Sequence, residues 1–345
     1  MHTRRGFAQP AEPCHDQPKR RMPPARGMRA RHLGVGPGMR AITYSKYGTP
    51  DTLTLTDVPD PKVGPGEVLI RVRSASVNPV DWKVLAGYLD GLMQVDFPAI
   101  PGWDVSGVVE AIGPDTPEYA VGDEVIAYAR KDWVQQGTFA ELVSAPVRTV
   151  ARKPAALDWN EAAGLPLAGL TAYQLLHRLD TTKGDTVLVH AAAGGVGILA
   201  VQIATALGAR VIGTASEGNH EFLRELGAEP VTYGDGLAER VRELAPEGVD
   251  VVVDFVGGVL ETTQAVLKDG GRHGSIADAT VAEAGGISAW VRPDSADLQA
   301  LADLADAGKL TVPVAEVFAL ENAAKAYELS QGGHVRGKIA IEVSR

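Results

Sequence analysis

Glycine and alanine dominate one short stretch of the chain, residues 191–197, between an apolar run and a segment with helical spacing. The apolar run, residues 186–190, is typical of a buried parallel strand. Apolar residues then recur at helical spacing up to Leu207, and Gly208 marks a helix end. Where a glycine-rich turn opens a helix, backbone amides and the helix dipole attract a phosphate group. The stretch therefore predicts a phosphate-binding turn.

The surroundings of this turn support the phosphate interpretation. A second predicted strand, residues 209–214, follows the helix, so the unit closes as strand, helix and strand. A glycine pattern alone is weak evidence, but here it follows a strand and opens a helix. The alternative is that the small residues only let a helix pack closely on a sheet. We favour phosphate binding.

The elements around this unit divide the chain into regions. Short alternating strands with Gly and Pro turns fill residues 39–157, which predicts a β-barrel-like domain. Helices and strands alternate over residues 158–308, which predicts a doubly wound parallel sheet. Residues 309–345 return to strand, helix and strand. We expect an α/β protein in which this last segment completes the first domain and the parallel-sheet domain is inserted before it.

Residues 1–38 differ in composition from the rest. They are rich in Arg, Pro, Gly and Ala, and eight basic residues against two acidic ones give a net charge of +6. The whole chain carries −10, so the remainder carries −16. We predict a disordered basic leader, with Met39 as the natural beginning of the folded chain.

Composition also limits the function classes. The negative charge argues against nucleic acid or an anionic membrane as the main partner. No apolar run reaches the roughly 18 residues of a transmembrane helix, so we expect no membrane span. The only cysteine, Cys14, excludes an intrachain disulfide and a cysteine-built zinc site. These features fit a cytoplasmic protein.

Residues 39–345 resemble the medium-chain dehydrogenase/reductase superfamily, and within it the zinc-free quinone oxidoreductase group. The matches follow the family's order through residues 64–70, 76–81, 101–109, 122–125, 170–173, 190–197, 226–228, 250–258 and 337–339. The resemblance implies a GroES-like β-barrel domain plus a Rossmann domain, with the active site in the cleft between them. It also implies NADPH as the cofactor and a homodimer.

This chain differs from the zinc-dependent members of the superfamily at the positions of their metal ligands. Zinc-dependent relatives carry Gly-His-Glu where this chain has Gly102-Trp103-Asp104, and a ligand cysteine near Asn78. Their four-cysteine lobe is missing. Trp103 cannot bind zinc, and Asn78 would be a poor neutral ligand. We therefore expect no metal and no alcohol oxidation at a zinc centre.

Without a metal, the protein has to orient a hydride-donating cofactor and stabilise developing charge. Reduction of an enone or quinone places negative charge on oxygen, which hydrogen-bond donors stabilise. The candidate catalytic residues are Asn78, Lys83, Tyr88 and Trp103. For each there is a plainer alternative: Asn78, together with Asp81, as turn residues before and after Pro79, Lys83 and Tyr88 as solvated or core-edge side chains, and Trp103 as a packing residue. Many relatives carry tyrosine at the position of Lys83, so the proton donor stays open, with solvent as one source.

The resemblance also implies which residues contact the cofactor. NAD-preferring proteins carry an acidic residue at the end of the second strand. That position is Ser216 here, whose hydroxyl could donate to the 2′-phosphate of NADPH, although Glu217 is adjacent. Relatives often carry Arg or Lys where this chain has Gly218 or Asn219. The predicted cofactor contacts are Asn78, Thr171, Ala192, Ala193, Gly194, Gly195, Val196, Gly197, Ser216, His220, Tyr233, Phe255, Val256, Ile276, Ala277, Asp278 and Lys338.

We predict an NADPH-dependent oxidoreductase that transfers a hydride to a quinone or an α,β-unsaturated carbonyl compound without a metal. One alternative is an enoyl-thioester reductase, although the sequence shows no basic pocket for a coenzyme A phosphate. Another is a non-catalytic NADPH-binding protein, because some relatives have structural or RNA-binding roles. In each case the expected ligands are small molecules.

Overall fold

The computed structural model describes residues 38–344. The predicted leader, except for Gly38, lies outside the described residues. The chain from Met39 onward forms two sets of strands, one mostly antiparallel and one wholly parallel. Among the described residues, no helix combines the length and the apolar character needed to cross a membrane.

Strand β3 (Glu67–Val77) is the centre of a seven-stranded sheet. It pairs antiparallel with β5 (Asp104–Ile112), β8 (Leu142–Pro146) and β17 (Lys338–Glu342). Strands β6 (Glu124–Tyr128) and β9 (Val150–Arg152) extend the sheet beyond β5. Two small pairs complete the strands of this region: β1 (Met39–Thr43) with β2 (Thr54–Val58), and β4 (Val95–Ile100) with β7 (Val134–Gln136).

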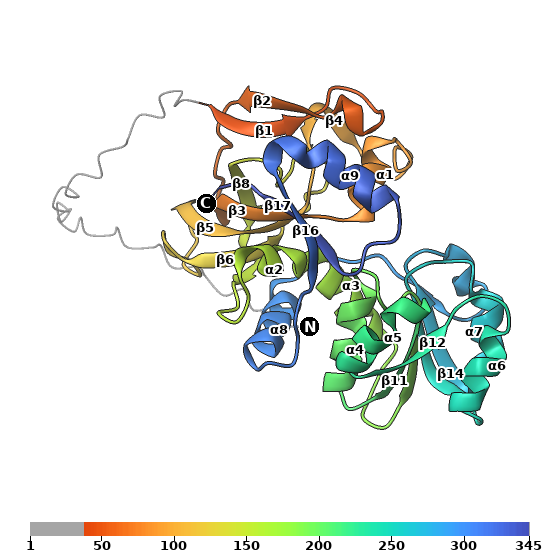
Figure 1. Ribbon diagram of the computed structural model, residues 1–345. Helices are drawn as coiled ribbons and strands as arrows, with labels where there is room; N and C mark the ends of the chain where they lie inside the picture. The colour runs from red at the N-terminus through yellow and green to blue at the C-terminus, as the bar shows by residue number, and fades with distance from the viewer. Residues whose placement is uncertain (1–37, 345) are drawn as a thin grey trace, which may run out of the picture. The chain divides into compact units, whose positions relative to one another are not determined.

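The end of the chain joins this same sheet. Strand β16 (Val314–Ala319) pairs parallel with β17, and β17 pairs antiparallel with β3, almost 270 residues earlier in the sequence. Figure 1 shows both C-terminal strands in blue, with β17 between β16 and β3 in the sheet order. The chain therefore returns to its first sheet after it has built the parallel one.

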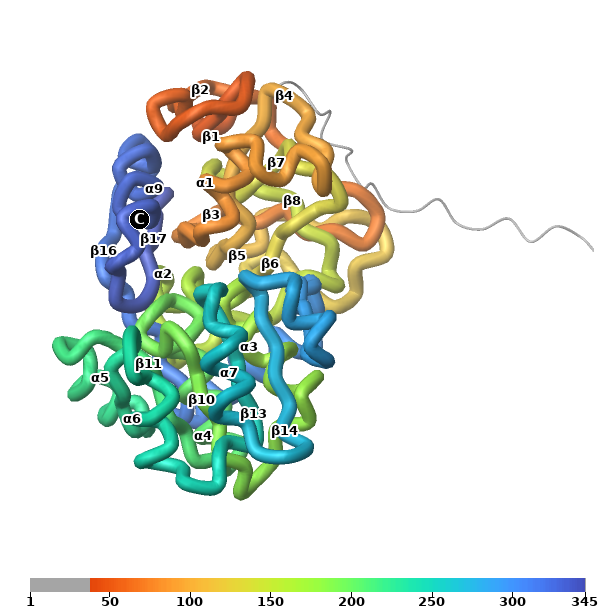
Figure 2. Tube along the Cα trace, turned by 90° about the vertical axis from the view of Figure 1, so that its right-hand side faces the viewer, coloured from red at the N-terminus to blue at the C-terminus, as the bar shows by residue number. Residues whose placement is uncertain are grey.

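The second sheet has six parallel strands in the order β12-β11-β10-β13-β14-β15. Their bounds are β10 (Thr186–Val189), β11 (Arg210–Ala215), β12 (Ala228–Thr232), β13 (Val249–Asp254), β14 (Leu267–Ser275) and β15 (Ile287–Ser288). The chain runs outward from β10 to β12 and then crosses back to β13, which lies beside β10 (Figure 2). The strand order therefore reverses at β10, and ligands bind at such switch points beyond the carboxyl ends of the strands.

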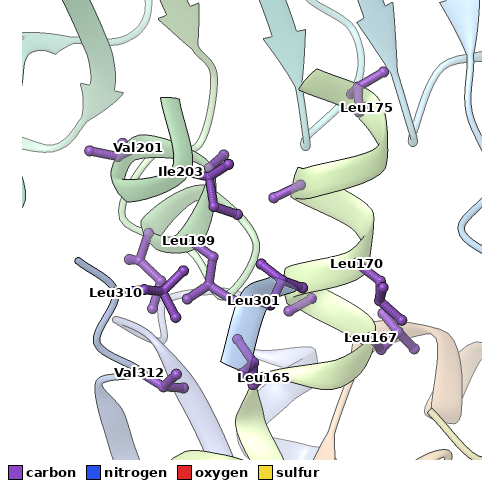
Figure 3. Close-up of a cluster of buried hydrophobic side chains, with 14 of the residues drawn as sticks. Leu165, Leu167, Leu170, Leu175, Leu199, Val201, Ile203, Leu301, Leu310 and Val312 are labelled. Atoms are coloured by element: carbon purple, nitrogen blue, oxygen red, sulfur yellow. The ribbon is translucent and has the colours of Figure 1, made fainter. Parts of the chain in front are cut away.

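Helices pack around both sheets. They are α2 (Trp159–Gly164), α3 (Pro166–Arg178), α4 (Gly197–Ala206), α5 (His220–Glu225), α6 (Leu237–Leu244), α7 (Leu260–Val266), α8 (Ser295–Asp306) and α9 (Ala323–Gln331). Leucines of α3, α4 and α8 meet in one core, among them Leu170, Leu199 and Leu301 (Figure 3). Burial of one such side chain stabilises the fold by about 1.5–3 kcal/mol. This core fixes the start of α4.

One helix was not predicted from the sequence. Helix α1 (Pro79–Leu85) begins with proline at its first position, where the missing N–H costs nothing. The Asp81 carboxylate accepts a hydrogen bond from the Asn78 backbone N–H at 2.7 Å and so closes the first turn. Asp81 therefore acts as a turn residue, as the plainer alternative predicted. The Asn78 side chain instead forms hydrogen bonds with other parts of the chain.

Candidate active site

The glycine-rich turn lies between β10 and α4 and is tied to the neighbouring strand. Ala191 adopts a left-handed conformation with φ of 54° directly after the strand. The Ala191 N–H donates to Thr214 Oγ1 and the Ala192 N–H to the Thr214 carbonyl, both at 3.0 Å. At Gly197, a Cβ atom would stand 2.1 Å from the Ala191 carbonyl oxygen, so only glycine fits. The close packing of the turn therefore requires glycine at position 197.

A cavity of about 540 Å³ connects this turn to the antiparallel sheet. Thirteen of the predicted site residues line it: Asn78, Lys83, Trp103, Thr171, Gly194, Gly195, Val196, Gly197, Phe255, Val256, Ile276, Ala277 and Lys338. They come from the loops beside β3 and β5, from α1 and α3, from the carboxyl ends of the parallel strands and from the start of β17. The structure therefore brings most of the predicted site into one space.

The other predicted residues do not line the cavity. Ala192 and Ala193 are buried beneath the turn, and Tyr88 is 73% exposed outside the cavity. Asp278 caps a short 3₁₀-helix, because its carboxylate accepts from the Thr280 N–H at 2.9 Å. Tyr88 therefore lies away from the cavity wall and the Asp278 carboxylate is engaged in its own turn, and the roles predicted for both residues stay predictions.

The predicted adenosine contacts gather near the carboxyl ends of β11 and β12. Ser216 Oγ accepts from Asn219 Nδ2 at 3.1 Å, in the short turn that follows β11. His220 Nε2 lies 3.4 Å from Thr232 Oγ1, and Tyr233, next in the chain, is 57% exposed. These three residues therefore lie near one another at one edge of the parallel sheet.

A buried hydrogen-bond network fixes the Asn78 side chain within the cavity wall. Asn78 Nδ2 donates to Asp104 Oδ2 at 2.8 Å, and Lys338 Nζ donates to Asn78 Oδ1 at 2.5 Å. The other carboxylate oxygen of Asp104 accepts the Leu167 N–H at 2.8 Å. Asp104 thus joins the barrel, the C-terminal strand and the first turn of α3. Sequence reasoning did not single out Asp104, which is recognisable only once the register places it beside Asn78.

Burial dominates the electrostatics of this network. It raises the pKa of Asp104 to about 6 and the pKa of Asp81 to about 8, and it lowers the pKa of the Lys338 ammonium. Lys338 Nζ and Asp104 Oδ2 lie 4.0 Å apart, and the charge of each group opposes the pKa shift of the other. At neutral pH, Asp81 is therefore mostly protonated.

A further cation near the adenosine side was missed from the sequence. Arg336 Nε donates to Asn219 Oδ1 at 2.7 Å, and its Nη2 donates to the Gly218 carbonyl at 3.1 Å. Its guanidinium carbon lies 5.1 Å from the centroid of the Phe222 ring. The loop after β11 has no basic residue of its own at positions 218 and 219, and Arg336 supplies one from the C-terminal segment. The contact spans more than a hundred residues, so no local pattern could predict it.

Comparison with known proteins identifies the family. Residues 64–155 match the alcohol dehydrogenase GroES-like domain, and residues 226–341 match the zinc-binding dehydrogenase family. The chloroplast envelope quinone oxidoreductase homolog of Arabidopsis thaliana is 30% identical over 89% of this chain and 99% of its own length. This chain belongs to the medium-chain dehydrogenase/reductase superfamily, in its quinone oxidoreductase-like group.

Two further relatives agree with this assignment. The chloroplastic NADPH-dependent alkenal/one oxidoreductase of Arabidopsis thaliana is 33% identical over 88% of this medium-chain reductase and 79% of its own length. The solved quinone oxidoreductase of Coxiella burnetii has a TM-score of 0.77 at 35% identity, covering 89% of this chain and 99% of that one. The predicted fold class, a GroES-like domain plus a Rossmann domain in an α/β protein, is confirmed.

The site of this medium-chain reductase fits a dinucleotide. The cavity begins at the switch point of the parallel sheet, and four consecutive residues of the glycine turn line it. The bare backbone of Gly197 allows the close turn that aims the first amides of α4 at a phosphate. Within residues 38–344, no group of three or more His, Cys, Asp or Glu side chains is placed to hold a metal ion.

Proposed function

We propose that the protein is an NADPH-dependent, metal-independent reductase of quinones and α,β-unsaturated carbonyl compounds. One observation carries the proposal: a single cavity connects the glycine turn to the buried network of Asn78, Asp104 and Lys338. The relatives named quinone oxidoreductase and NADPH-dependent alkenal/one oxidoreductase support the substrate class. Trp103 and Asn78, at the positions of two zinc ligands, support chemistry without a metal.

Each end of the cofactor has residues suited to it. The backbone amides of residues 195–197 would hold the pyrophosphate, since the Gly194 N–H donates to the Ala191 carbonyl at 3.0 Å. Arg336 and Ser216, with His220 and Tyr233 nearby, would hold the 2′-phosphate that distinguishes NADPH from NADH. Thr171, Phe255, Val256, Ile276, Ala277 and Lys338 would enclose the nicotinamide end.

When bound, NADPH supplies a hydride, and the protein's own groups orient the reactants and stabilise the charge that develops. Negative charge develops on the substrate oxygen as a substrate carbon gains the hydride, and a proton from solvent completes the product. Lys83 and Lys338 line the cavity, and their amino groups would stabilise that charge as hydrogen-bond donors. Asn78, held by two hydrogen bonds, would orient both reactants. Apolar side chains such as Val80, Leu89 and Trp290 line the remaining wall and suit a substrate with an apolar body.

The test is oxidation of NADPH across a panel of quinones, enals, enones and enoyl thioesters, repeated with NADH, together with elemental analysis for zinc. We expect turnover of quinones or enones, lower efficiency with NADH and no stoichiometric metal. Turnover of enoyl thioesters alone would favour the thioester alternative. Tight NADPH binding without oxidation by any acceptor would favour the non-catalytic binding protein. Stoichiometric zinc that is lost together with activity on chelation would contradict the metal-independent mechanism.

A further inference from the structure

Most polar side chains that line the cavity already have hydrogen-bond partners. Asn78 and Lys338 satisfy one another, and Thr171 Oγ1 donates to the Leu167 carbonyl at 2.7 Å. Tyr128 differs. It also lines the cavity, and its buried hydroxyl forms no well-aligned hydrogen bond among the described residues. The Arg130 side chain is within reach of the phenol oxygen, but a guanidinium can only donate, so the phenol hydrogen has no acceptor within the described chain. A buried polar group without a partner costs free energy, so its presence calls for an explanation.

The strand register explains why Tyr128 lies at this point. In the β5–β6 ladder, Asp104 stands directly opposite Tyr128, and in the β3–β5 ladder it stands opposite Ser76. Directly paired residues on antiparallel strands project from the same face of the sheet. Tyr128 is therefore the cross-strand neighbour of the carboxylate that holds Asn78. Edge-on packing against Trp103, with ring centroids 6.2 Å apart, fixes its ring.

The hydroxyl is suited to donating a hydrogen bond. Burial raises the pKa of the Tyr128 hydroxyl above its ordinary value, so it remains a protonated phenol at neutral pH. The Arg130 guanidinium carbon lies 5.9 Å from the ring centroid and adds a positive charge beside the donor. A protonated phenol next to a cation favours an oxygen that carries or gains negative charge.

We propose that the Tyr128 hydroxyl is the missing hydrogen-bond donor to the carbonyl oxygen of the substrate. This inference rests on the proposed function and adds to it a residue that contacts the substrate. The phenol donates a hydrogen bond and keeps its proton, since solvent supplies the proton of the product. The donor strengthens its contact as charge develops on the oxygen, and so it accelerates hydride transfer.

The chain offers a matched control for this proposal. Tyr327 is also fully buried, and its hydroxyl also lacks a partner among the described residues, but it does not line the cavity. Tyr128→Phe and Tyr327→Phe each remove a single oxygen atom from a buried site. Any kinetic difference between the two variants therefore measures the effect of a hydroxyl group at the cavity wall, because both variants lose a buried hydroxyl.

The first measurement is kcat/KM for an enone or a quinone, with the dissociation constant for NADPH as a check. We expect Tyr128→Phe to lose about 10- to 100-fold in kcat/KM, toward the lower end of the loss seen on removal of one oxyanion donor, with NADPH binding unchanged. Tyr327→Phe should match the wild type. Equal kinetics in all three proteins would overturn the proposal.

The second measurement does not require turnover. Cyclohexenone is bound to the NADP⁺-loaded protein, and its affinity and the infrared carbonyl stretch of the bound ketone are recorded. In the wild type and in Tyr327→Phe, the hydrogen bond should lower the stretching frequency, whereas Tyr128→Phe should bind about tenfold more weakly and lack the shift. If no acceptor is reduced, the proposed function fails, yet this shift still decides whether Tyr128 contacts a carbonyl oxygen. An identical stretch in all three proteins, or no binding, would contradict the role of Tyr128.

Discussion

At the scale of single residues, Arg336 offers the sharpest test of cofactor choice. A hydrogen bond between a guanidinium and a phosphate contributes about 1.5–3 kcal/mol, which corresponds to roughly 10- to 100-fold in affinity. We therefore expect Arg336→Ala to weaken NADPH binding by that factor and to leave NADH binding nearly unchanged. Dissociation constants for both cofactors, measured by quenching of protein fluorescence, check this expectation.

The control for Arg336 is Arg224→Ala. Arg224 lies on α5 near the same loop, but it forms an exposed ion pair with Glu221 at 3.1 Å. Such pairs contribute little to stability, so this variant should bind both cofactors like the wild type. An equal loss of NADPH and NADH affinity in Arg336→Ala would show that the residue only holds the loop in place.

Asp81 predicts a pH dependence of stability. Its carboxyl group has a folded-state pKa of about 8, raised by burial above the ordinary value of 3.8. The folded state therefore favours the protonated form, and the resulting stability is complete below about pH 4 and is lost as the pH rises toward about 8. Asp81→Asn imitates the protonated group, so its Tm should fall less than that of the wild type between about pH 5 and about pH 8.

Thermal unfolding monitored by circular dichroism at several pH values measures this difference. Asp235→Asn is the control, because Asp235 is exposed and the substitution removes a carboxylate from the surface. Its Tm should follow that of the wild type across the range. If Asp81→Asn also parallels the wild type, then the buried carboxyl group does not titrate in the proposed way.

The sequence could predict residues of the site from matched motifs and from residue type, but not from contacts between distant strands. Asn78 and Lys338 each belong to a matched motif, and the structure joins them in one hydrogen bond. Asp104 and Tyr128 become neighbours through strand register, and Arg336 reaches its loop across the sequence. Tyr88 was named because its residue type suited the chemistry, but residue type alone does not fix where a side chain points.

At the scale of elements, the start of α4 depends on Gly197. An alanine Cβ would stand 2.1 Å from the Ala191 carbonyl oxygen and 2.7 Å from the Ala192 Cα, and both of these are backbone atoms. Overpacking of this kind costs about 1–3 kcal/mol. We expect Gly197→Ala to lower the free energy of unfolding by that amount and to abolish NADPH binding, because the turn must move.

Gly194→Ala is the matched variant in the same turn. There a Cβ would meet only the Ala191 carbonyl oxygen, at 3.3 Å, so a small shift would accommodate it. Urea unfolding of both variants separates the two cases. Equal stability of Gly197→Ala and the wild type would mean that the turn has more room than its packing indicates.

Elements with strong periodicity were predictable, and irregular ones were not. The run that became β10 and the helical spacing that became α4 agree with the structure to within one or two residues. Helix α1 has only seven residues and begins in a turn-like Asn-Pro sequence, so propensity alone favoured a turn. Its formation depends on the buried Asp81 carboxyl group, which the sequence pattern does not reveal.

At the scale of the whole described chain, the C-terminal segment contacts both ends of the proposed cofactor path. Arg336 bonds to the loop after β11, the Gly337 N–H donates to the Ala193 carbonyl at 3.2 Å, and Lys338 bonds to Asn78. Residues 336–338, where the chain enters β17, thus contact the loop after β11, the glycine turn and Asn78. The return of the chain to its first sheet was predictable from its pattern, whereas this threefold contact follows from the way the strand packs.

These contacts predict that NADPH stabilises the C-terminal segment together with the glycine turn. A ligand that binds the folded state slows the local opening of the elements it connects. We expect bound NADPH to slow hydrogen exchange in residues 335–339 and 217–220 as well as in 191–197. Peptides from β1 and β2, which contribute no residue to the cavity, should exchange at an unchanged rate. In Arg336→Ala, protection should persist at the glycine turn and be lost at residues 217–220. Protection confined to residues 191–197 in the wild type would show that the cofactor does not engage the C-terminal segment.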